Sequence, residues 1–149
     1  MNSVSTNDVL NRIVVLHSRS LAVYLTYAPP WQMLGMAEAM TVIKQIADDH
    51  QRTVDRLAAI ILENGGTVDH GEFPMSFTSL HDLSATYLLK LAIERQVKVI
   101  AAVDKLSDML TLSPFAHAAA REVLGEAKGH LQNLEELQQQ MSLPATSHS

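Results

Sequence analysis

The sequence predicts an all-α protein, and three observations indicate it. Hydrophobic residues make up 47% of the chain but aromatic residues only 5%, so aliphatic residues and methionine supply most of the apolar content, a balance typical of helical proteins. Apolar residues recur at spacings of three and four, the period of a buried helix face. Proline and glycine pairs punctuate these stretches at 29–30 and 65–66. With 149 residues, the chain fits one domain spanning 1–149.

The first half of the chain predicts two helices. A helix over about 7–28 ends where Pro29 and Pro30 disfavour helical geometry. A second helix over about 35–64 ends at Gly65, a typical helix stop. Each carries one apolar stripe. The first stripe consists of Leu10, Ile13, Val14, His17, Leu21 and Tyr24, and the second of Met36, Met40, Ile43, Ala47, His50, Val54, Leu57 and Ile61.

The second half predicts two more helices. One covers about 79–111, where Ser79 and Asp82 resemble a capping box. The other covers about 114–140 and begins with Ser113 as N-cap before Pro114. We expect the tail, about 142–149, to be disordered. The expected inward residues are Leu83, Tyr87, Leu91, Glu94, Lys98 and Ala101 in the third helix, and Phe115, Ala119, Val123, Ala127, His130, Leu134 and Leu137 in the fourth.

The lengths of the connections favour a particular four-helix bundle. The first and last connections are short, so each joins an antiparallel pair. The middle connection, 65–78, could span roughly 46 Å at ~3.3 Å per residue, and a helix of about 30 residues is ~45 Å long. It can therefore cross the whole bundle and make the second and third helices parallel. A meander would need only a few residues there, so we expect an up-down-down-up order with a long crossover.

The composition of the chain argues against several classes of function. The chain has no cysteine, so it has neither disulfides nor thiolate metal sites. A net charge of −5 argues against nucleic-acid binding, and the sequence shows neither a signal peptide nor an apolar run of about 20 residues that would span a membrane. We therefore expect a soluble cytoplasmic protein. Helices that are apolar on more than one face, as at 58–62 and 88–93, favour a homo-oligomer, with a dimer as the first expectation.

An ionisable residue stands within each predicted stripe: His17, His50, Glu94 and His130. In a crossover topology His50 and Glu94 each lie about 15 residues into their helices, and His130 reaches the same level, with His17 about one turn away. Three imidazoles and one carboxylate suit a single transition-metal ion such as zinc, iron or manganese. The sequence therefore predicts a metal site formed by these four residues.

Two alternatives remain open for these residues. In the first, each histidine is a core residue that makes one hydrogen bond, and Glu94 pairs with His130 or with neighbours on the side of Arg95. Glu94 is exposed if the inward line of its helix runs through Leu88, Leu91, Arg95 and Ala102, because this helix is apolar around much of its circumference.

Over about residues 8–138 the sequence resembles the ferritin-like superfamily, especially its bacterioferritin and Dps-like branches. The resemblance rests on the helix order, on the run LAAIILENGG at 57–66 and on the run GHLQNLEEL at 129–137. The resemblance implies a four-helix bundle whose di-iron members bind two metals through one Glu on each of two helices and a Glu-x-x-His tetrad on each of the others. Here the tetrad 127–130 keeps only His130, and the tetrad 50–53 has His50 in place of the bridging glutamate.

Loss of both bridging carboxylates removes the negative charge that holds two cations together. We therefore expect a degenerate site for one metal ion, with a role in metal storage, sensing or modest redox chemistry. The alternative is a metal-free helical scaffold or dimerisation protein that has lost the di-iron chemistry. The sequence does not decide whether the protein is an enzyme.

Overall fold

A computed structural model describes residues 2–30, 36–80 and 83–142. The described chain contains helices and no strand, which confirms the all-α prediction. None of its helices combines the length and the apolar character needed to cross a membrane. The helices are α1 (Asn2–Ser18), α2 (Leu21–Tyr27), α4 (Ala37–Glu63), the 3-10 helix η1 (Met75–Ser79), α5 (Ala85–Asp108) and α6 (Pro114–Ser142).

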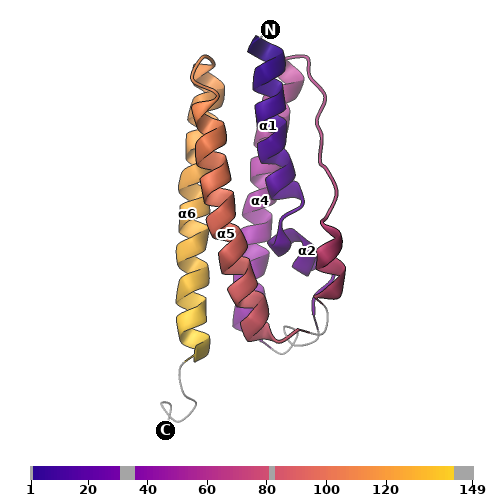
Figure 1. Cartoon of the computed structure of the whole chain (residues 1–149), viewed down its shortest axis with the longest axis vertical. Coiled ribbons are helices and arrows are strands. Elements are labelled where there is room, and N and C mark those ends of the chain that lie inside the picture. The colour runs from indigo at the N-terminus through magenta and orange to yellow at the C-terminus, as the bar shows by residue number, and fades with distance from the viewer. Residues whose placement is uncertain (1, 31–35, 81–82, 143–149) are drawn as a thin grey trace.

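The long helices α1, α4, α5 and α6 run along the long axis of the molecule (Figure 1). Helix α4 packs against α1 and α2, α5 packs against α6, and the two pairs meet chiefly where α4 contacts α6. After α4 the chain travels back along one side of the molecule to η1, so that α4 and α5 run in the same direction (Figure 1).

The first predicted helix, 7–28, is two helices in the structure. The amide of Arg19 donates to the carbonyl of Val15 at the end of α1. Ser20 then adopts an extended conformation (φ −71°, ψ 159°), and its hydroxyl accepts from the amide of Val23 as the N-cap of α2. The prediction of a continuous helix was wrong because the side chain of Ser20 satisfies an amide at a new helix start.

The start of α5 also differs from the prediction. Residues 75–79 form η1, and α5 begins at Ala85 after the N-cap Ser84, whose hydroxyl accepts from the amide of Tyr87. The prediction that this helix starts at Ser79 was therefore wrong. The expected capping partner Asp82 and most of the expected disordered tail, 143–149, lie outside the described residues.

The buried face of α5 is not the predicted one. Tyr87 is half exposed, and Glu94, Lys98 and Ala101 are exposed. Burying the charged side chains would cost desolvation energy, whereas turning the aliphatic ones inward removes apolar surface from water. The buried residues of α5 are Ala85, Leu88, Leu89, Gln96, Val103, Leu106 and Ser107.

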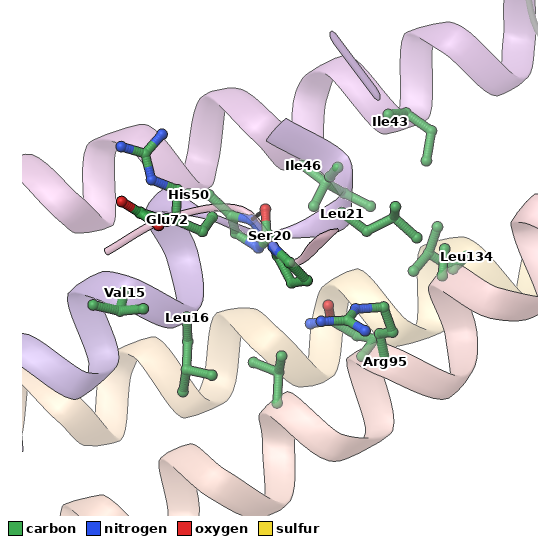
Figure 2. A pocket seen from close by; sticks show the side chains of 16 residues that line it. Val15, Leu16, Ser20, Leu21, Ile43, Ile46, His50, Glu72, Arg95 and Leu134 are labelled. Atoms are coloured by element: carbon green, nitrogen blue, oxygen red, sulfur yellow. Dashed lines mark hydrogen bonds between the residues drawn. The ribbon is translucent and has the colours of Figure 1, made fainter. Parts of the chain in front are cut away.

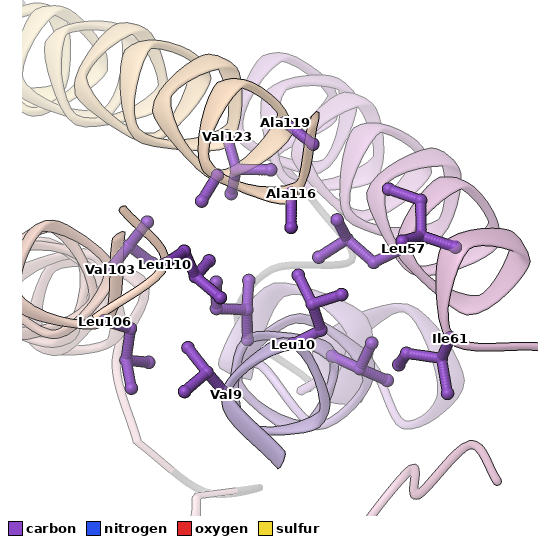
Figure 3. Close-up of a cluster of buried hydrophobic side chains, with 14 of the residues drawn as sticks. Val9, Leu10, Leu57, Ile61, Val103, Leu106, Leu110, Ala116, Ala119 and Val123 are labelled. Carbon is purple, nitrogen blue, oxygen red and sulfur yellow. The ribbon is translucent and has the colours of Figure 1, made fainter. Parts of the chain in front are cut away.

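The core consists of two apolar clusters. The first joins α1, the second half of α4, the second half of α5 and the first half of α6, with Leu10, Leu57, Val103 and Ala116 among its members (Figure 3). The second joins α2, the first halves of α4 and α5, η1 and the end of α6. Along each long helix, the residues between the two clusters include a buried polar side chain. These side chains are His17, His50, Gln96 and His130, and we call them the polar layer.

Two leucines of α4 test the packing of the first cluster. Leu57 is 0% exposed and Leu62 is 61% exposed. We expect Leu57→Ala to lower the free energy of unfolding by about 2–5 kcal/mol, because it leaves a cavity in the core. Leu62→Ala, the control on the same helix, should change it by less than about 0.5 kcal/mol. Urea unfolding followed by circular dichroism measures both, and equal effects would contradict the packing described.

Candidate functional site

Three of the four predicted ligands meet in the polar layer. His17 from α1, His50 from α4 and His130 from α6 are only 3%, 3% and 6% exposed. The ring centroids of His17 and His50 are 4.8 Å apart, and those of His50 and His130 are 5.3 Å apart. Histidines distant in the sequence therefore form one buried cluster, which we call the histidine cluster.

His17 is held by its own helix. Its Nδ1 lies 2.8 Å from the carbonyl oxygen of Ile13, one turn earlier in α1. A carbonyl oxygen only accepts, so Nδ1 carries the proton and donates. The lone pair of the neutral ring then resides on Nε2.

His50 is held by the break between α1 and α2. Its Nδ1 lies 2.8 Å from the hydroxyl oxygen of Ser20, the residue that also caps α2. Its Nε2 is buried and has no hydrogen-bond partner among the described residues. The cap that ends the first helical segment thus also orients an imidazole of the cluster.

His130 is held by a carboxylate. Its Nε2 donates to Oδ2 of Asp49 over 2.9 Å, and the other oxygen of Asp49 pairs with Arg52. Because a carboxylate only accepts, the proton of the neutral ring is on Nε2 and the lone pair is on Nδ1. That Nδ1 is buried and also lacks a partner in the described part of the chain.

Burial keeps these imidazoles neutral. Desolvation lowers the pKa of His17 from 6.5 to about 4, against the raising effect of its bond to Ile13. Desolvation, together with the neighbouring imidazoles His17 and His130, lowers the pKa of His50 well below its ordinary value. Burial also lowers the pKa of His130, although Glu126 opposes this change. Neutral imidazole is the form that binds metal ions.

Glu94, the fourth predicted ligand, does not belong to the cluster. Its side chain is exposed on α5, because the buried face of this helix is turned away from the predicted line. Gln96 takes the place of a buried polar residue on α5, and its Nε2 donates to the carbonyl oxygen of Ala127 over 2.9 Å. The prediction of Glu94 as a core ligand was wrong, and the open alternative that placed Glu94 in solvent describes this helix better.

Sequence reasoning missed Gln96, the fourth member of the polar layer, and also missed Ser20 and Asp49, which contact His50 and His130. Gln96 could have been found from the spacing of seven in Leu89, Gln96 and Val103, which places the three residues on one helix face. Ser20 before an apolar run is an N-cap signal. Asp49 gives no comparable signal, because its contact with His130 joins two helices that are distant in the sequence.

The histidine cluster shares one feature with known metal-binding histidines and lacks another. Each imidazole uses one ring nitrogen for a carbonyl, hydroxyl or carboxylate, the arrangement that orients metal-binding histidines. Yet within residues 2–30, 36–80 and 83–142, no group of three or more His, Asp or Glu side chains is spaced to hold a metal ion. The two imidazole nitrogens without partners are therefore not part of an assembled ligand group in this structure.

The lowered pKa values predict acid sensitivity of the metal-free protein. Below pH 6.5 the histidines of the unfolded chain take up protons, while His17 in the folded chain stays neutral down to about pH 4. The unfolded state therefore binds more protons in this window, so stability falls as the pH falls through it.

Urea unfolding with a chelator present, repeated between pH 7 and pH 4, measures this fall. Replacing one buried histidine, as in His17→Leu, should reduce the slope by up to about 1.4 kcal/mol per pH unit. An unchanged slope in His17→Leu would contradict the assignment.

Comparisons of the chain with protein-family models, curated proteins and solved structures found no match. The resemblance to ferritin-like proteins therefore stays a prediction from the sequence. The function has to be argued from the geometry of the histidine cluster.

Proposed function

We propose that the chain binds one divalent transition-metal ion through His17, His50 and His130. The observation that supports this proposal best is the pair of buried imidazole nitrogens, Nε2 of His50 and Nδ1 of His130, that have no partner in the described chain. A buried polar atom without a hydrogen bond costs about 1–3 kcal/mol. A metal ion would use the lone pair of His130 Nδ1 and, in the tautomer whose Nδ1 donates to Ser20, the lone pair of His50 Nε2, and so remove that cost.

The spacing of the rings suits one shared ion. Nitrogen ligands bind zinc at about 2.1 Å, so imidazoles on neighbouring positions of a tetrahedral ion have ring centres roughly 5 Å apart. The observed separations of 4.8 and 5.3 Å lie close to that value. Binding requires the rings to rotate about their side-chain bonds until the three nitrogens converge, with the hydrogen bonds on the opposite nitrogens adjusting.

The donor set restricts the ion. Three neutral imidazoles suit zinc or ferrous iron better than magnesium or calcium, which prefer oxygen ligands. Three histidines would also leave one coordination position for water or another small ligand. With Glu94 in solvent and both bridging carboxylates absent, the chain lacks the charge to hold two adjacent cations, and we propose a single ion.

We further propose that this site lies in a ferritin-like four-helix bundle. The parallel direction of α4 and α5, with the connecting segment along the side of the molecule (Figure 1), supports that topology. The proposed role is that of a degenerate ferritin-like site that stores, senses or uses one ion.

A second candidate function is a metal-free helical scaffold or dimerisation protein. It is favoured by the finding that no ligand group in the described residues is spaced for a metal ion. Two apolar side chains are exposed where α5 connects to α6: Leu112 (79%) in the turn and Phe115 (73%) in the first turn of α6. A surface of this kind suits contact with a second copy.

Metal analysis distinguishes the two functions. The purified chain, incubated with zinc or ferrous iron and then dialysed, should retain about one ion per chain. We expect His50→Ala and His130→Ala to lose it and the control His117→Ala, at the start of α6, to keep it. The proposal would be contradicted if the wild-type chain retained no metal and if neither chelator nor added ions changed its thermal stability. That result would favour the scaffold.

The carboxylate behind His130 provides a second test. Asp49→Asn weakens the acceptor that orients this ring, and such outer partners are worth about 10–100-fold in metal affinity. The control Asp48→Asn changes the same charge at an adjacent, exposed position and should leave the affinity unchanged. A competition titration with a chromophoric chelator measures both, and equal affinities of the two variants would contradict the role of Asp49.

A further inference from the structure

A pocket of about 200 Å³ lies beside the histidine cluster, where α1 gives way to α2 (Figure 2). Ser20 and His50 belong to its wall, and the segment between α4 and η1 contributes Glu72 and Pro74. Most of the remaining wall is apolar. Its aliphatic members include Leu16, Leu21, Ile43, Ile46, Val99 and Leu134.

Arg95 gives this apolar pocket an uncompensated positive charge. Its side chain is half-buried, and burial lowers its pKa below the ordinary value. The guanidinium carbon lies 4.7 Å from the centroid of Phe77, but the group makes neither an ion pair nor a hydrogen bond within the described chain. Figure 2 shows the guanidinium extending into the space between the helices.

The other charges at the pocket differ from Arg95. The Nε of Arg19 donates to the carbonyl oxygens of His70 and Gly71, and its guanidinium stacks on Phe73. The Nε of Arg19 is thus engaged with the loop, whereas no nitrogen of Arg95 makes such a bond within the described chain. Glu72 is exposed at the rim, where it opposes the entry of a second negative charge.

The size of the pocket limits its occupant. A buried apolar cavity of about 150 Å³ holds benzene, so the space here suits a molecule with about six carbon atoms. Such a molecule would place its apolar body against the aliphatic wall. A planar carboxylate matches the fork of N–H donors on a guanidinium and forms two parallel hydrogen bonds with it.

We propose that the pocket binds a small monocarboxylate with an apolar body of about six carbons, its carboxylate paired with Arg95. This proposal rests on the pocket and on Arg95, and it holds whether or not the histidine cluster binds a metal ion. Glu72 favours a monocarboxylate over a dicarboxylate, because a second carboxylate would meet a like charge at the rim.

Calorimetric titration of the chelator-treated full chain with hexanoate, 1-hexanol and adipate tests the proposal. We expect saturable binding of one hexanoate per chain and binding at least tenfold weaker for 1-hexanol, which lacks the charge-assisted hydrogen bonds. Adipate, with the same chain length and a second carboxylate, should also bind more weakly than hexanoate. No saturable binding of hexanoate at millimolar concentration would overturn the proposal.

Two positions on α5 distinguish a specific contact with Arg95 from a general effect of positive charge. Arg95→Gln should weaken hexanoate binding at least tenfold and leave 1-hexanol unaffected, whereas Lys98→Gln, which removes a charge from an exposed position of the same helix, should change neither. Arg95→Lys keeps the charge but loses the fork, so we expect intermediate affinity. Equal hexanoate affinity in Arg95→Gln and the wild type would overturn the assignment.

A variant that fills the pocket tests its location. Ala92 belongs to the pocket wall and is half-buried, so Ala92→Leu should abolish binding of hexanoate and 1-hexanol together. Circular dichroism and thermal unfolding, measured on every variant, show whether the fold is intact. Undiminished binding in a folded Ala92→Leu would place the ligand elsewhere and overturn the proposal.

Discussion

The polar layer between the two apolar clusters is the constraint on which the rest of this structure depends. Each long helix contributes one buried polar side chain to it, and three of the four are imidazoles that burial holds neutral. Aliphatic residues of similar volume at these positions would join the two clusters into one core and avoid the cost of unpartnered ring nitrogens. The histidine cluster thus lowers the free energy of unfolding locally, and the two apolar clusters on either side offset this loss.

The break at Ser20 connects this layer to the pocket. In one continuous helix through Arg19 and Ser20, the amide of Val23 would bond to a backbone carbonyl, and Ser20 would not act as an N-cap. Instead the extended conformation of Ser20 starts α2 anew, and its hydroxyl both caps α2 and contacts His50. Residues on each side of this break, from Val15 to Ala22, contribute to the wall of the pocket. The extended conformation of Ser20 therefore orients the imidazole of His50 and helps to shape the pocket beside it.

The sequence identified the three histidines because each stands in a helix with a single clear apolar stripe, where buried neighbours three and four residues away place the imidazole inward. It failed on α5, where apolar residues surround the helix and two faces compete. The face with Leu88, Leu89 and Val103 buries aliphatic side chains, whereas the predicted face would bury Glu94 and Lys98, so desolvation decides the rotation of the helix. The contacts of Asp49 and Arg95 depend on how separate helices are placed, which local periodicity does not encode.

His50 belongs both to the histidine cluster and to the wall of the pocket, and this shared residue links the two proposed sites. A ligand in the pocket that shifts the His50 ring, or the hydroxyl of Ser20 behind it, changes the position of an imidazole nitrogen that a metal ion would use. An ion that fixes the His50 ring in turn fixes part of the pocket wall. Because the coupling between two binding equilibria is reciprocal, a carboxylate that strengthens metal binding by some factor must itself bind more tightly to the metal-loaded chain by the same factor. The geometry of one buried imidazole would therefore set how strongly the two sites are coupled.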